Sequence, residues 1–170
     1  VFRASHAPSA LSRRTGGEQA KEDPMTTAGS STKGLGDLSV GDVMTREVVT
    51  LEINDTLHVA DDVMSLGRIR HMPVLDGDGE VAGIISQRDL FRGALARVLG
   101  YGEHAQQKLL NILLVKEVMS NEPVSVSPDL SLREAARIMY EKKIGSVLVI
   151  DDGALVGILT EGDFVRLAQS

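Results

Sequence analysis

The sequence predicts an α+β fold made of two copies of one β-α-β-β-α unit that pack against each other. The first observation is an internal repeat, because Met44 and Met119 lie in matching surroundings 75 residues apart. The second is that the offset between matching residues falls to 74 at Gly83 and Gly157. The second copy is therefore one residue shorter than the first, in the turn that corresponds to residues 76–80. An offset kept through whole copies, with its single change in a turn, indicates a duplicated structural unit. Each copy is near the lower size limit for an independent hydrophobic core, so the copies should bury each other.

Within each copy, a short β-prone run comes first, at residues 48–51 and 124–126. A helix should follow, because apolar residues recur at spacings of three, three and one, which keeps them on one stripe. These residues are Leu57, Ala60, Val63 and Met64 in the first copy and Leu132, Ala135, Ile138 and Met139 in the second. Ser131 and Glu134 predict a capping box at the start of the second of these helices.

Two further strands and a second helix complete each copy. The strands are predicted at residues 72–75 and 81–85, and again at 146–150 and 155–159, and the Asp-Gly turns between them are typical of hairpins. The second helix should begin near Gln87 in the first copy and near Glu161 in the second. The predicted organisation is a disordered tail (1–37), a first domain (38–92), a connecting helical segment (93–114) and a second domain (115–170).

The connecting segment has two open interpretations. It is helix-prone, with a break at residues 100–102 and an apolar cluster of Leu109, Leu110, Leu113 and Leu114. It is either a helix packed on its own body or a helix offered to a second subunit or a client protein.

The composition of the 170 residues excludes several classes of protein. A formal net charge of −6 with 3% aromatic residues argues against a nucleic-acid-binding surface. The chain has no cysteine, which excludes disulfides and cysteine metal sites, and the four histidines lack ligand spacing, so no metal site is expected. The apolar runs are strand-sized, so no membrane span is predicted. The tail has no secretory h-region, and its acidic residues disfavour a transit peptide, so a cytoplasmic location is expected. Met25 would open a more ordinary protein start, so the residues before it need not be native.

The best candidate for chemistry is a Gly-x-x-Ser/Thr-x-x-Asp motif at each predicted strand-to-helix corner. It occurs as Gly83, Ser86 and Asp89 and again as Gly157, Thr160 and Asp163. Unpaired N–H groups at a helix start favour phosphate, the hydroxyl can donate to it, and the carboxylate can accept two hydrogen bonds from a ribose diol. The glycine would let the backbone approach a flat base closely. The alternative is that both motifs are only helix-capping boxes, which need no ligand.

Together, the Val-Met-Ser/Thr starts, the paired units and the two terminal motifs resemble a cystathionine-β-synthase (CBS) domain pair, also called a Bateman module. The resemblance covers about residues 38–167. It implies two units packed sheet to sheet with pseudo-twofold symmetry, and clefts between them where many members bind AMP, ADP, ATP or S-adenosylmethionine. It also implies a regulatory module that commonly forms dimers.

By this resemblance, the two aspartates would hold ribose, and the Ser or Thr would hold phosphate or ribose. The adenine would lie against the segment that enters the first strand and against the start of the second strand. The residues so assigned are Thr45, Val48, Val49, Ile69, His71, Met72 and Pro73 in the first copy, and Ser120, Val124, Gly145, Ser146 and Val147 in the second, while Arg70 would contribute to the phosphate site of the first copy.

The first copy should be the better phosphate site. Arg88 stands inside its motif, where the second copy has Gly162, and a guanidinium can bind phosphate with two hydrogen bonds. Arg68 and Arg70 precede its second strand, although a solvated helix end would also explain these two cations. The second site is expected to be weak, empty or suited to a less charged ligand.

The leading hypothesis is a non-enzymatic, ligand-sensing homodimer that binds an adenosine-containing small molecule and signals in trans to an unknown client protein. No cofactor is required, and the nucleotide would act as a regulatory ligand with or without Mg²⁺. The alternative is a ligand-free protein-interaction or dimerisation module in which both motifs are caps. No Walker loop, nucleophile elbow or oxyanion hole accompanies His71, Ser86 and Asp89, so an enzyme is not expected.

Overall fold

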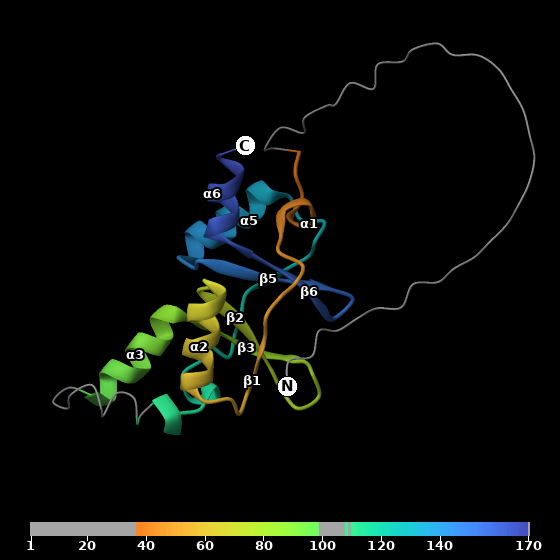
Figure 1. The fold of residues 1–170 in the computed structure, drawn as a ribbon. Coiled ribbons are helices and arrows are strands. Elements are labelled where there is room, and N and C mark those ends of the chain that lie inside the picture. Colours follow the sequence, from red (N-terminus) through yellow and green to blue (C-terminus); the bar gives the residue numbers. More distant parts are fainter. Residues whose placement is uncertain (1–36, 99–107, 109, 170) are drawn as a thin grey trace, which may run out of the picture. The chain divides into compact units, whose positions relative to one another are not determined.

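The computed structural model describes residues 37–98, 108 and 110–169, with the side chains of 93–98 left out. The first half contains α1 (Val40–Val43), β1 (Leu51–Glu52), α2 (Leu57–Gly67), β2 (His71–Leu75), β3 (Val81–Ser86) and α3 (Gln87–Val98). The second half contains η1 (Val115–Glu117), β4 (Ser125–Val126), α5 (Leu132–Lys142), β5 (Ser146–Asp151), β6 (Ala154–Thr160) and α6 (Glu161–Leu167) (Figure 1). The predicted disordered tail lies outside the described residues except for Asp37, and so does the predicted break at 100–102.

Each half forms a three-stranded sheet, with orders β1-β2-β3 and β4-β5-β6, which confirms the α+β prediction. The first strand of each sheet runs parallel to the second, and the second runs antiparallel to the third. The first strands are shorter than predicted: β1 holds only Leu51 and Glu52, and β4 holds only Ser125 and Val126. Each half nevertheless has the predicted β-α-β-β-α order of elements along the chain.

Both predicted hairpins are confirmed, and each is closed by turn chemistry. In the first, the Asp76 carboxylate accepts hydrogen bonds from the N–H groups of Asp78 and Glu80, each at 3.0 Å. In the second, Asp152 and Gly153 both adopt positive φ, at 46° and 82°. Each turn joins the second and third strands of its sheet, and the third strand ends at the Ser or Thr of the motif.

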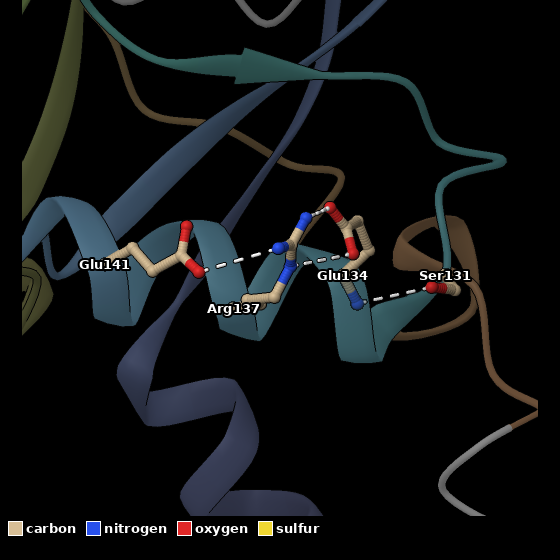
Figure 2. Close-up of polar contacts among 4 residues, drawn as sticks. All are labelled: Ser131, Glu134, Arg137 and Glu141. Atoms are coloured by element: carbon tan, nitrogen blue, oxygen red, sulfur yellow. Dashed lines mark hydrogen bonds and ion pairs between the residues drawn. The ribbon is translucent and has the colours of Figure 1, made fainter.

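The helices begin where the caps predict, with one difference. The Ser131 hydroxyl accepts a hydrogen bond from the Glu134 N–H at 3.2 Å, as expected of an N-cap. The Glu134 carboxylate does not bond back to Ser131 but accepts from Arg137, which also approaches Glu141 at 3.5 Å (Figure 2). The prediction of a full capping box here is therefore wrong, because an arginine one turn later competes for the glutamate.

Two segments at the starts of the repeated units cross to the opposite half. We call residues 38–45 the first arm and residues 113–120 the second arm. Thr45 of the first arm pairs with Ile158 at the edge of β6, and Ser120 of the second arm pairs with Ile84 at the edge of β3. The two residues of each pair exchange two backbone hydrogen bonds, and the four N···O distances are 2.9–3.0 Å. The two contacts are equivalent in the repeat, since Thr45 corresponds to Ser120 and Ile158 corresponds to Ile84.

Each arm is part of the hydrophobic core of the half to which it crosses. Val40, Val43 and Met44 pack with residues of β4, α5, β5 and β6, and Figure 1 shows α1, in orange, beside α5. Leu113 and Val115 pack in turn with residues of β1, α2, β2 and β3. The two halves are thus joined by exchanged core side chains.

The described end of the connecting segment lies on its own body. Leu113 is buried in the first half's core, and Leu110 packs against that core. Ile112, by contrast, is exposed. Among the described residues, no helix is long and apolar enough to cross a membrane.

Candidate functional site

Strand pairing places the predicted motif residues at one corner of each half. In the first corner, His71 at the start of β2 pairs with Ser86 at the end of β3, and the Gln87 N–H donates to the Arg70 carbonyl at 2.9 Å. The start of β2 and the end of β3, which are 15 residues apart in sequence, therefore lie side by side. Asp89 follows in the first turn of α3.

The second corner repeats this arrangement. Ser146 at the start of β5 pairs with Thr160 at the end of β6, and the Glu161 N–H donates to the Gly145 carbonyl at 3.0 Å. Asp163 lies in the first turn of α6. Both helices begin at the predicted residues, Gln87 and Glu161, because each strand ends at the residue just before the helix.

In the first corner, Asp89 and Ser86 form a reciprocal cap. Asp89 Oδ2 accepts from the Ser86 N–H at 2.9 Å and from the Ser86 hydroxyl at 2.5 Å, and the Asp89 N–H donates to Ser86 Oγ at 3.3 Å. Asp89 Oδ1 has no hydrogen-bond or ion-pair partner in the part of the chain that the structure describes. The side chain is half-buried, so this carboxylate retains an uncommitted acceptor.

In the second corner, both oxygens of Asp163 are engaged. Oδ2 accepts from the N–H of Thr160 at 2.8 Å and from its hydroxyl at 2.9 Å. Oδ1 accepts from Arg166 Nη2 at 2.9 Å, and the same nitrogen donates to the Val43 carbonyl of the first arm at 3.1 Å. Asp163 is only 4% exposed, so a buried carboxylate is fully paired here.

His71 lies where the two halves meet. A β-carbon built on Gly145 would stand 3.0 Å from His71 Cε1 and 3.5 Å from Glu161 Oε2, so the imidazole faces the second half. Burial is the main cause that lowers the pKa of His71, and the nearby positive charge of Arg70 adds to it. The negative charges of Glu161 and Asp89 act in the opposite direction, and Arg88 has a smaller lowering effect. Charged groups from both halves therefore surround the first corner.

The cations of the first copy remain accessible. Arg68, Arg70 and Arg88 are all exposed. Arg68 caps the C-terminus of α2 in the left-handed conformation, which agrees with a solvated helix end. Arg70 and Arg88 are close enough to influence His71, whereas the corresponding positions of the second copy are Gly145 and Gly162. The first corner is therefore the more basic of the two.

The motif glycines have a different role from the one we expected. A β-carbon on Gly83 would stand 2.5 Å from the Ser120 carbonyl oxygen and 2.9 Å from the Met119 sulfur. The second arm, and not a ligand base, occupies the space that the missing side chain leaves. The Val-Met-Ser/Thr sequence of one copy thus packs against the motif glycine of the other copy. Because both motifs occur in both copies, the sequence could have suggested that they contact each other.

The remaining predicted residues divide by accessibility. Met72 and Val147 are fully buried in the two cores, so their side chains are not available to a ligand, and Pro73 and Ser146 are buried as well. Val124 approaches the start of β5, because its carbonyl accepts from the Leu148 N–H at 2.9 Å. Thr45, Val49 and Ser120 are exposed, and Val48, Ile69 and Val124 are half-buried. No group of three or more His, Asp or Glu side chains suited to a metal ion occurs among the residues that the structure describes.

Comparison with known proteins agrees with this doubled architecture. The family model for the CBS domain matches residues 40–96 and 115–170. The chain belongs to the CBS domain family. The CBS pair is 33% identical to a homoserine O-acetyltransferase of Methanohalophilus mahii over 74% of its own length, but it spans only 23% of that protein.

Solved structures of CBS proteins share the fold. The crystal structure of a putative acetoin utilization protein (AcuB) from Vibrio cholerae is 36% identical, with a TM-score of 0.65, and the match covers 78% of this chain and 90% of that one. CBSX2 in complex with AMP is 27% identical, with a TM-score of 0.63 and coverages of 78% and 96%. The CBS domain pair of protein MJ0100, in complex with 5′-methylthioadenosine and S-adenosyl-L-methionine, is 26% identical, with a TM-score of 0.65 and coverages of 77% and 95%.

Proposed function

We propose that this CBS pair is a regulatory module that binds an adenosine-containing small molecule at the first corner. The observation that carries the proposal is the state of Asp89, whose Oδ1 is uncommitted beside exposed arginines and a histidine from the same corner. The complexes of CBSX2 with AMP and of MJ0100 with 5′-methylthioadenosine and S-adenosyl-L-methionine support the ligand class.

Each part of a nucleotide has a chemical counterpart at the first corner. Asp89 Oδ1 can accept hydrogen bonds from a ribose diol, and such bonds to a charged acceptor are stronger than neutral ones. The guanidinium groups of Arg70 and Arg88 and the N–H groups that open α3 suit phosphate. The half-buried side chains of Val48 and Ile69 offer apolar surface for adenine.

The basic character of the first corner favours a nucleotide phosphate over S-adenosylmethionine. Arg70 and Arg88 would attract AMP, ADP or ATP, whereas the sulfonium and amino groups of S-adenosylmethionine are cationic. No cofactor is needed for this recognition. The bound ligand would control a partner protein, or the chain's own dimer, by binding two conformations with different affinity.

Isothermal titration calorimetry with AMP, ADP, ATP and S-adenosylmethionine tests the proposal. We expect saturable binding of at least one nucleotide, and Asp89→Asn should weaken it about tenfold or more, because a charge-assisted hydrogen bond is lost. Ser131→Ala is the matched control, since it removes a helix cap of the same kind in α5 without touching the corner. The absence of heat with all four ligands would overturn the proposal.

A second candidate is a ligand-free interaction module, and the reciprocal cap at the first corner favours it. Ser86 and Asp89 bond to each other in both directions, and Asp163 accepts from the N–H and hydroxyl of Thr160, all without any ligand. On this reading, Asp89→Ala would lower the free energy of unfolding by roughly 1 kcal/mol, the usual value of a cap, and would change no binding. The same titrations therefore separate the two candidates.

A further inference from the structure

The two copies of the motif differ in how their aspartates are used. Asp89 commits one oxygen to its cap, whereas Asp163 commits both, the second to Arg166. Asp163 is also nearly inaccessible, whereas Asp89 is half-buried. A buried carboxylate whose two oxygens are already paired gains little from a ribose diol, because it must first give up an existing charge-assisted bond.

Arg166 joins Asp163 to the first arm. Its Nη2 donates both to Asp163 Oδ1 at 2.9 Å and to the Val43 carbonyl at 3.1 Å. Val43 is the last residue of α1, whose apolar side chains lie in the second half's core. The guanidinium therefore links the start of α6 to a segment more than 100 residues away in sequence.

The first copy has the same residues without the same link. Arg92 corresponds to Arg166 in the repeat, and Val118 corresponds to Val43. Arg92 is exposed, and within the described ranges it makes no hydrogen bond or ion pair with Asp89 or with the Val118 carbonyl. Identical side chains in equivalent positions thus adopt different arrangements in the two copies.

We infer that the duplicated motif has divided its roles: the first corner binds the ligand, and the second is a latch in which Arg166 clamps Asp163 to the first arm. The ligand half of this inference rests on the proposed function, while the latch half does not. It follows that one chain binds one nucleotide. It also follows that Arg166 sets how tightly the first arm is held.

Amide hydrogen exchange measures the latch without any ligand. The Met44 N–H donates to the Val40 carbonyl at 2.8 Å, and the Thr45 N–H donates to the Ile158 carbonyl at 2.9 Å. In Arg166→Ala, exchange at these two amides should rise about tenfold, since a charge-assisted bond to the arm is lost. Arg92→Ala is the matched control and should leave exchange at Met119 and Ser120, the equivalent amides of the second arm, unchanged.

Calorimetry with AMP measures the division of roles. The native chain should bind one AMP per chain, Asp89→Asn should weaken binding about tenfold or more, and Asp163→Asn should leave the stoichiometry and, within about twofold, the affinity unchanged. Asp163→Asn also supplies a second test of the latch, because it should raise exchange in the first arm as Arg166→Ala does.

The outcomes separate this inference from the proposed function. Faster exchange in the first arm of Arg166→Ala supports the latch even if no nucleotide binds; in that case the proposed function fails together with the ligand half of this inference, and the latch half stands. Unchanged exchange in Arg166→Ala and Asp163→Asn overturns the latch, whatever AMP does. Binding of two AMP per chain, one of them lost in Asp163→Asn, overturns the division of roles while the proposed function stands.

Discussion

Gly157 lies so close to Met44 that a β-carbon at residue 157 would stand 2.5 Å from the methionine sulfur. The two residues are far apart in sequence and belong to opposite halves of the repeat. Their contact holds the first arm against β6, as the contact of Gly83 with Met119 holds the second arm against β3. The exchanged arms thus depend on the absence of a side chain at each motif glycine.

Alanine at either motif glycine should destabilise the fold. Gly83→Ala and Gly157→Ala should each lower the free energy of unfolding by roughly 1–3 kcal/mol, because the new methyl group must displace the packed arm. Gly77→Ala is the control, since nothing lies within 4 Å of its β-carbon position, and it should change stability by less than about 0.5 kcal/mol. Urea denaturation followed by circular dichroism measures all three. Equal effects at Gly77 and Gly157 would contradict the arm contact.

The buried valines of the two arms should contribute alike. Val40 and Val115 occupy equivalent repeat positions, and both are fully buried in the core of the opposite half. Val40→Ala and Val115→Ala should each cost about 2 kcal/mol of unfolding free energy, from lost burial and the cavity left behind. Val165→Ala, at an exposed valine, should cost much less. A negligible loss at Val40 would show that the first arm does not belong to the second core.

His71 should make stability depend on pH. Its pKa is lowered in the folded chain, so the unfolded chain binds the proton more tightly and protonation favours unfolding. The contribution is fully present above the ordinary value of 6.5 and is lost as the pH falls through 6.5 toward the lowered value. We expect the free energy of unfolding to decrease from about pH 7.5 to about pH 5.5, and less so in His71→Gln. Identical pH profiles for the two proteins would exclude His71 as the cause.

Nucleotide binding should weaken with salt. If Arg70 and Arg88 bind phosphate, the affinity for ATP should fall between about 50 mM and 500 mM NaCl, because salt screens exposed charges. Arg88→Gln should lower both the affinity and its salt dependence. Arg137→Gln, which removes an exposed arginine on α5, should change neither. The test is calorimetry at three salt concentrations, and a salt-independent affinity would place the phosphate away from these arginines.

The cap of α5 offers a measure of a cap without a ligand. Ser131→Ala should lower the free energy of unfolding by about 1 kcal/mol, because the Glu134 N–H loses its acceptor. Ser131→Asp should restore most of that loss, since an aspartate is an equally good N-cap and its charge favours a helix start. Thermal denaturation of the two variants provides the comparison. A similar loss in Ser131→Asp would mean that the hydroxyl acts by some other contact.

The sequence by itself determined the doubled β-α-β-β-α fold, because apolar spacing, turn residues and the repeat offset are local signals that each copy confirms for the other. It also located the two corners, since Ser86, Asp89, Thr160 and Asp163 stand where a strand ends and a helix begins. Only the tertiary structure decided which half each arm packs against, because the residue pattern of an arm does not indicate which core will bury it. It likewise decided that the motif glycines accommodate methionines and that Arg166, unlike Arg92, reaches its aspartate. These contacts join residues that are far apart in sequence and meet only when the arms cross, so the spacing of residues along the sequence could not predict them.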